Sequence, residues 1–309
     1  MEVELQHASE PQQPVRTLWF EDGNLVIQAG NSQYRVYRGF LATRSSVFED
    51  MLSFPQPPDS ELVDGCPLVH LPDPEVEVTP FLKALFEPEF FMPFPAGTTF
   101  DAVVGCLRLS HKYGVDYLHR RALSWQVPED QIYTVCAIQL AREVDAPRIL
   151  PRAFYTLGEY FNELGIALFN GAVYRGVETR LSVQDQKSFS KGLAIQSTTA
   201  AVDILRFLSH PLDIPGCDDP GHCHSTRLQA VDWSRTFIRD YPFSVLYIWA
   251  SEDWGLLEYL CTTCLEALRK THQDARQAFW DKLPEMYDLP PWTELEQMKT
   301  KAIGPSPFG

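Results

Sequence analysis

Four cysteines form two groups whose residue types and spacing suit a zinc ion. Cys217 and Cys223 lie in a loop rich in Gly, Pro and Asp, and Cys261 and Cys264 lie three positions apart in a predicted helix. Residues with this spacing share one face of a helix, so both sulfurs can reach the same ion. Four thiolates suit tetrahedral Zn²⁺ with bonds of about 2.3 Å. We therefore predict a structural zinc site, in which four protein ligands leave no open position for catalysis.

Other interpretations of the same residues stay open. His222 or His224 could replace one thiolate, because imidazole is also a common zinc ligand. Cys261 and Cys264 could instead be small buried hydrophobic residues among the surrounding leucines, as free cysteine often is. A disulfide is a third alternative, which a reducing compartment disfavours.

Short motifs of the common enzyme classes are missing from the sequence. It contains no Gly-x4-Gly-Lys-Ser/Thr, Gly-x-Gly-x-x-Gly or His-Glu-x-x-His. Gly-x-Ser-x-Gly is missing too. Ser188 and Lys191 spell Ser-x-x-Lys, but the companion Ser-Asp-Asn and Lys-Thr-Gly motifs are not present. We therefore predict that the protein is not an enzyme.

Charge and hydrophobic patterning exclude several classes of partner. Acidic residues outnumber basic ones by 41 to 26, for a net charge of −15, which repels nucleic acid and anionic lipid. No apolar run reaches the length of a membrane span, and residues 1–16 lack the pattern of a signal peptide. Seven cysteines, an odd number, favour a reducing compartment. We expect a cytoplasmic or nuclear protein that binds neither nucleic acid nor membrane.

In the N-terminal part, the spacing of apolar residues alternates between that of strands and that of helices. Residues 25–27 and 34–37 are predicted strands joined by a turn at Gly30 and Asn31, and Ser45 or Ser46 is the predicted N-cap of a helix. The remaining elements are a helical stretch over 40–52, a strand over 67–71, a helix over 78–86 with Pro80 in its first turn, and helical spacing over 100–123. The predicted core consists of Val26, Leu41, Phe48, Leu52, Phe81, Leu85, Val104 and Leu107.

These segments resemble the BTB/POZ family. The matching residues are Phe20 to Ile27, Tyr34 to Ala42, Arg44 to Leu52, His70 to Asp73 and Leu107 to Leu118. The resemblance implies an α+β domain over residues 17–126 that binds other proteins through its outer faces. Such domains bind a partner protein or associate with themselves.

Two departures from the family pattern concern its partners. Arg38 stands where many members carry histidine, and residues 1–16 read as a disordered arm instead of a helix that swaps between protomers. Members that recruit cullin-type ubiquitin ligases carry a hydrophobic-x-Glu motif, and the stretch Thr98-Thr99-Phe100-Asp101 lacks that glutamate.

The C-terminal part, residues 127–309, is predicted to be an all-α domain that contains the zinc site. The expected helices begin at Pro128 and cover 148–168, with a break near Gly158 or Gly165, a stretch from Ser182, and 200–208, 229–239, 243–250 and 255–272. The tail from Leu283 is predicted to be extended, and Trp233, Trp249 and Trp254 to be core residues. Residues 279–292 resemble the tail of fungal BTB proteins with a similar cysteine set, which favours zinc.

Four phenylalanines near residue 90 have two interpretations: a core beneath a loop, or an exposed patch that anchors a partner. They are Phe86, Phe90, Phe91 and Phe94.

Taken together, the sequence predicts a scaffold or adaptor protein that acts by protein–protein interaction. Its alternatives are a substrate adaptor of a cullin-type ubiquitin ligase and a transcriptional co-regulator that acts through partners.

Overall fold

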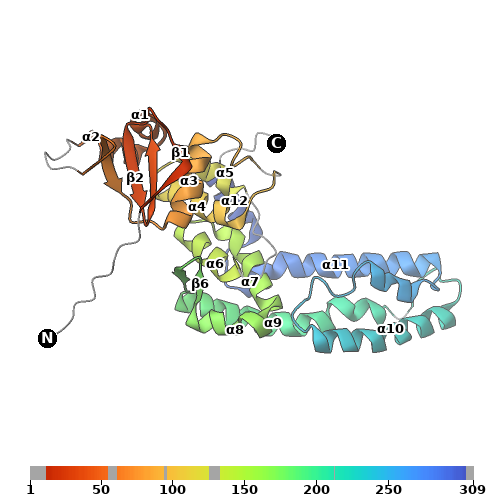
Figure 1. Ribbon diagram of the computed structural model, residues 1–309. Coiled ribbons are helices and arrows are strands. Elements are labelled where there is room, and N and C mark those ends of the chain that lie inside the picture. Colours follow the sequence, from red (N-terminus) through yellow and green to blue (C-terminus); the bar gives the residue numbers. More distant parts are fainter. Residues whose placement is uncertain (1–11, 55–60, 94–95, 125–132, 212, 304–309) are drawn as a thin grey trace, which may run out of the picture. The chain divides into compact units, whose positions relative to one another are not determined.

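The computed structural model describes residues 12–54, 61–93, 96–124, 133–211 and 213–303. The chain divides into two compact units. One comprises Met1–Pro128 with Thr300–Gly309, and the other comprises Glu129–Lys299. The whole is mixed α+β, with a five-stranded sheet near the N-terminus followed mainly by helices (Figure 1).

The sheet of the first unit is built around one hairpin. Strands β2 (Leu25–Ala29) and β3 (Ser32–Val36) are antiparallel, and the turn between them places Gly30 at φ +55°, as the sequence predicted. The strand order is β1-β3-β2-β5-β4, completed by β1 (Gln13–Trp19), β4 (Leu62–Val63) and β5 (Cys66–His70). Every residue of β2 is buried, so both faces of the central strand are covered.

The predicted disordered arm is wrong for its last residues. Residues 13–16 belong to β1, which runs parallel to β3, and the Gln13 amide donates a hydrogen bond of 2.8 Å to the Asn31 carbonyl. The strand was missed because its side chains are mostly exposed, so it lacks an apolar pattern. The predicted arm otherwise falls on residues 1–11, outside the described part, and on Gln12.

Among the described residues up to Ser124, five helices accompany this sheet. Ser45 is the N-cap of α2 and accepts a hydrogen bond from the Phe48 amide at 3.0 Å, which confirms one of the two predicted caps. The predicted helix over 78–86 begins earlier, at Glu75, where two acidic residues favour the first turn, so Pro80 lies inside the helix. The helices are α1 (Arg38–Arg44), α2 (Ser46–Ser53), α3 (Glu75–Phe86), α4 (Phe100–Lys112) and α5 (Asp116–Leu123).

The predicted core of this unit is confirmed, because all eight of its residues are buried. Helices α3 and α4 approach closely: a Cβ at Gly105 would lie 2.6 Å from the Glu77 carbonyl oxygen. Of the phenylalanines near residue 90, Phe91 is fully buried and Phe86 and Phe90 are half-buried, which favours core packing. Phe94 lies outside the described residues.

The second unit consists mainly of helices, and Figure 1 shows its long helices α9, α10 and α11 extending along a similar direction. The predicted helix from Ser182 is confirmed, and Ser182 is the N-cap of α9. The predicted start at Pro128 lies outside the described residues. The described α-helices are α6 (Thr134–Glu143), α7 (Leu150–Glu159), α8 (Phe161–Asn170), α9 (Val183–Val202), α10 (Pro220–Asp240), α11 (Thr262–Met286) and α12 (Trp292–Ile303), of which α12 belongs to this unit up to Lys299. Short 3₁₀ helices are η2 (Pro147–Ile149), η3 (Ile204–Leu208) and η4 (Glu252–Leu257).

The prediction that this part is all-α is wrong in one place. Strands β6 (Ala172–Tyr174) and β7 (Val177–Thr179) form an antiparallel hairpin. Arg175 and Gly176 both have positive φ, at 50° and 81°, which is the backbone of a tight two-residue hairpin turn. The strands are only three residues long, too short for alternation to reveal them.

Three further predictions in this part need correction. Residues 243–250 are not helical, because the chain there turns sharply, with Trp249 at φ +66°. Most of the described tail, residues 283–303, is helical, because α11 continues to Met286 with Pro284 inside it and α12 follows. Of the three predicted core tryptophans, Trp249 is buried and Trp254 half-buried, but Trp233 is 38% exposed.

Gln196 connects distant segments inside the second unit. Its fully buried amide donates to the Phe243 carbonyl at 2.6 Å, and its oxygen accepts from the Tyr287 hydroxyl at 2.7 Å. A Cβ at Gly192, one turn earlier in α9, would lie 2.1 Å from the Tyr287 ring. Helices α9 and α11 and the segment after α10 are therefore fixed against one another.

In the part of the chain that the structure describes, no helix combines the length and apolar character needed to cross a bilayer.

Candidate metal centre

The four predicted zinc ligands lie together in the second unit. Their sulfur atoms are all within 4.8 Å of one another. Cys217 and Cys261 are half-buried, whereas Cys223 and Cys264 are 3% and 2% exposed. The structure thus brings two cysteine pairs from distant parts of the sequence into one group that could bind a metal ion.

The starts of two helices position these thiols. Cys223 lies in the first turn of α10, which begins at Pro220 because Asp219 is its N-cap and accepts a hydrogen bond from the His222 amide at 3.0 Å. Cys261 is the N-cap residue of α11, and Cys264 lies in the first turn. Cys217 follows Gly216, whose φ of +80° turns the chain toward α10.

This arrangement corrects the prediction that Cys223 lies in a loop and that Cys261 lies inside a helix. Pro220 and Gly221 are residue types typical of loops, so the sequence did not indicate the helix that begins at Pro220. Proline is well tolerated in the first turn of a helix, where its missing N–H has no intrahelical partner. Three of the four thiols therefore belong to the N-cap or the first turn of a helix.

The spacing of the sulfurs fits a tetrahedral ion better than a disulfide. Four sulfurs at about 2.3 Å from a central Zn²⁺ are about 3.8 Å apart. The Sγ atoms of Cys217 and Cys261 are 3.9 Å apart, and all four cysteines are free thiols. A disulfide requires about 2.05 Å.

Local electrostatics differ between the half-buried and buried thiols. Hydrogen bonds from the backbone at Asp218 and Cys264 lower the pKa of Cys261 to about 7. Burial raises the pKa of Cys223 and Cys264 above its ordinary value. Helix N-termini favour thiolates, and a bound cation would deprotonate the buried thiols as well.

A buried arginine lies beside the group. Arg227 follows Cys223 by one helical turn, is 2% exposed, and lines the same hollow as Cys217, Cys223 and Cys264. One terminal nitrogen donates to the Phe207 carbonyl at 2.9 Å, but its Nε has no hydrogen-bond partner among the described residues. Burial lowers the pKa of Arg227, and the charges that oppose this are those of Cys264 and Cys223.

The presence of Arg227 bears on the choice between a metal site and four inert thiols. A buried cation is costly unless it is paired. Four thiolates around a divalent ion carry a net charge of −2, so they would supply the anionic partner. Neutral thiols would leave the guanidinium without one. Arg227 was not among the predicted site residues, although its i+4 spacing from Cys223 places both side chains on one face once the segment is known to be helical.

No histidine belongs to the group of four in the described part of the chain. His222 is exposed, and His224 is half-buried on the wall of the neighbouring hollow. Neither of the two predicted alternatives for a thiolate ligand is therefore placed among the sulfurs.

The Ser-x-x-Lys sequence does not form a nucleophile–base pair. Lys191 forms an ion pair with Asp288. Ser188 is 3% exposed and accepts a hydrogen bond from Gln184 at 3.4 Å.

No protein-family model, curated protein or solved structure matches the chain.

Proposed function

We propose that the protein is a scaffold or adaptor. A BTB/POZ-like domain over residues 17–126 binds another protein or a second copy of the chain, and a helical domain with a structural zinc ion offers a second binding surface.

The order of elements in the first unit is the observation that carries this proposal. Hairpin β2–β3, helices α1 and α2, strands β4 and β5, helix α3 and helices α4 and α5 follow in this order, which agrees with the α+β domain that the BTB/POZ resemblance implies. Motif residues support it as well. Asp73 follows β5, and its carboxylate accepts hydrogen bonds from the Tyr113 hydroxyl and, at 2.6 Å, from Lys112. A fold alone does not define a function, so binding must be tested directly.

Exposed apolar side chains on this unit suit a binding role. Phe54 is 69% exposed and Leu62 is 60% exposed. Large apolar side chains on a surface contribute strongly to binding when a partner covers them.

Zinc is the metal that the donor set favours. Four soft thiolates in a compact group suit tetrahedral Zn²⁺, and a complete ligand set supports a structural role. The buried guanidinium of Arg227 supports a charged, metal-bound group.

Affinity capture with the tagged full-length chain tests the binding function. The measurement is native mass spectrometry of the purified chain and its complexes, which counts protomers, partners and zinc together. We expect one stoichiometric partner, or a dimer, whose recovery falls with Phe54→Ser. Val183→Ser, which changes a side chain 66% exposed in the second unit, is the matched control. A chain that stays monomeric and captures no stoichiometric partner would contradict the proposal.

The same experiment separates the two alternatives. A cullin that co-purifies, and is lost when the surface near Phe100 is substituted, would favour the ubiquitin-ligase adaptor. DNA-binding proteins among the partners would favour the transcriptional co-regulator.

A further inference from the structure

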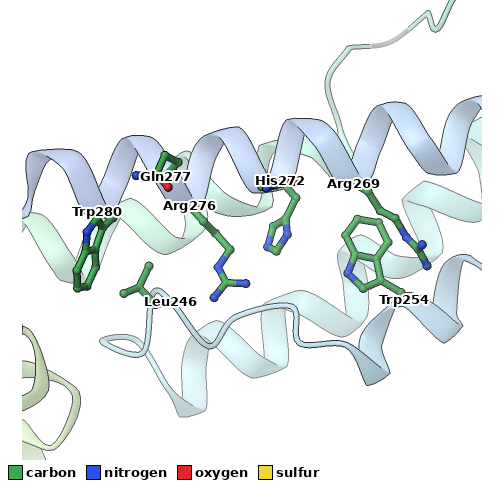
Figure 2. Close-up of a pocket in the computed structure, with 8 residues that line it drawn as sticks. Leu246, Trp254, Arg269, His272, Arg276, Gln277 and Trp280 are labelled. Carbon is green, nitrogen blue, oxygen red and sulfur yellow. The ribbon is translucent and has the colours of Figure 1, made fainter. Parts of the chain in front are cut away.

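A basic groove with aromatic ends lies along one face of α11, in the second unit. Arg269, His272 and Arg276 project from this face, with Trp280 toward one end and Trp254 toward the other (Figure 2). Leu246, from the irregular segment after α10, lies on the opposite wall. The groove has a volume of ≈ 510 Å³ and belongs neither to the cysteine group nor to the first unit.

The charge of this groove is opposite to that of the protein. The chain has 41 acidic and 26 basic residues, yet the lining includes two arginines and no carboxylate. Neither Arg269 nor Arg276 forms an ion pair with any described residue. Arg269 instead stacks its guanidinium on the Trp254 ring, with 5.4 Å to the centroid, which leaves its N–H edge able to donate.

Hydrogen bonds and ring stacking hold the walls of the groove in place. The Tyr155 hydroxyl accepts a hydrogen bond from the Leu246 amide at 2.8 Å, and Gln196 binds the Phe243 carbonyl. Trp280 stacks on Trp292 with ring centroids 5.2 Å apart. A site fixed in this way loses little conformational entropy when a ligand binds.

A second hollow continues the groove. It shares Leu246, Arg276 and Trp280 with the first, and it is also lined by Arg152 and Glu159. The second hollow leads from α11 toward α7, so the two together form an elongated surface, which suits a chain-like ligand better than a compact one.

The spacing of the arginines indicates the shape of the ligand. Arg269 and Arg276 are seven residues apart on a helix, a distance of about 10 Å along its axis. In a peptide extended as polyproline II, with three residues per turn, side chains three residues apart lie on the same face and are separated by about 9 Å. Guanidinium groups bind carboxylates with paired hydrogen bonds, and aromatic rings bind apolar side chains.

We propose that this groove binds an extended acidic segment of a partner protein. Two carboxylates three residues apart pair with Arg269 and Arg276, and neighbouring apolar side chains lie against Trp254 and Trp280. The inference rests on the proposed binding function and names the chemistry that one of its surfaces recognises.

Fluorescence anisotropy with the full-length chain tests the inference. The probe is a fluorescein-labelled octapeptide with two glutamates three residues apart and leucine between them, and the control probe has glutamine at both positions. We expect the glutamate peptide to bind at least tenfold more tightly, and its binding to weaken with rising salt. Arg276→Gln should weaken it about tenfold, which corresponds to about 1.4 kcal/mol.

Arg235→Gln is the matched variant, because it removes an equal charge from an arginine with a side chain 74% exposed on α10, outside the groove. It should leave peptide binding within twofold of the unmodified protein. Equal binding of the two peptides, equal binding by Arg276→Gln and the unmodified chain, or no binding of the glutamate peptide would each overturn the inference. Self-association lost with Arg276→Gln would also overturn it, because a second copy would then be the occupant.

The outcome is separable from that of the proposed function. Partner capture that depends on Phe54 and persists in Arg276→Gln, without peptide binding, would refute the groove and leave the adaptor standing. Peptide binding without any captured partner would support the groove and contradict the proposed adaptor function.

Discussion

Replacing Cys264 by serine distinguishes a metal site from a group of inert thiols. If Cys264 is only a buried thiol, the substitution buries a hydroxyl in its place and lowers the free energy of unfolding by about 1–3 kcal/mol. If it binds zinc, one of four metal bonds is lost as well. Structural zinc contributes about 10–16 kcal/mol to the folding of small zinc peptides, so a loss of at least about 4 kcal/mol is expected here.

Cys136→Ser supplies the matched control. Cys136 is 1% exposed, lies in α6 of the same unit, and is not part of the sulfur group. Its substitution measures the cost of exchanging a buried thiol for a hydroxyl without any metal contribution. The difference between the two losses in unfolding free energy therefore reports what the sulfur group contributes to stability.

Differential scanning calorimetry with and without a strong zinc chelator is the assay. For a unit of this size, 1 kcal/mol shifts the melting temperature by about 2–4 °C. We expect the chelator to lower the melting temperature of the unmodified protein and of Cys136→Ser, and to change Cys264→Ser little. Equal shifts for the two variants, together with an unmodified protein that is insensitive to the chelator, would refute the reasoning.

Three further predictions concern residues around the site and the groove. Arg227→Met should weaken zinc binding by about 10–100-fold in a competition with a chelator, because the buried counter-charge is lost, and unchanged affinity would contradict its role. Burial lowers the pKa of His272 to about 4 from 6.5, so the unfolded chain binds the extra proton and stability should fall as the pH falls from 6.5 to 4. His272→Gln should flatten that slope in urea unfolding, and an unchanged slope would exclude the histidine as its source. Gly192→Ala places a Cβ 2.1 Å from the Tyr287 ring and should lower the free energy of unfolding by about 3 kcal/mol. The control Gly255→Ala meets nothing within 4 Å and should change it little. Similar losses for the two variants would argue against close packing between Gly192 and Tyr287.

Local chemistry in the sequence was enough to predict several elements. Ser45 and Ser182 cap helices through their own hydroxyls, and Gly30 turns a hairpin because it lacks a Cβ. These features depend on a few neighbouring residues, so the sequence contains the information. The grouping of the four cysteines was predicted from residue type and spacing for the same reason, and the structure places their sulfurs together.

Features that depend on tertiary contacts were missed. Residues 243–250 have the apolar spacing of a helix, but Gln196 and Tyr155 bind their backbone and Trp249 adopts a positive φ. The role of Arg227 depends on α10 beginning at Pro220, which the Gly- and Pro-rich composition of the segment obscured. The arginine groove was missed because its opposite wall comes from that irregular segment.

The placement of the four thiols gives a bound ion the character of a reversible cross-link. Cys217 and Cys261 are separated by 44 positions, and the chain between them includes all of α10 and the irregular segment that follows. Closing a loop of this length removes about 4 kcal/mol of conformational freedom from the unfolded chain when a disulfide does it. A metal closes the loop without oxidation. The supply of zinc, and not redox state alone, would then determine how stably α10 and the irregular segment after it are held. The wall of the arginine groove that this segment forms would depend on zinc in the same way.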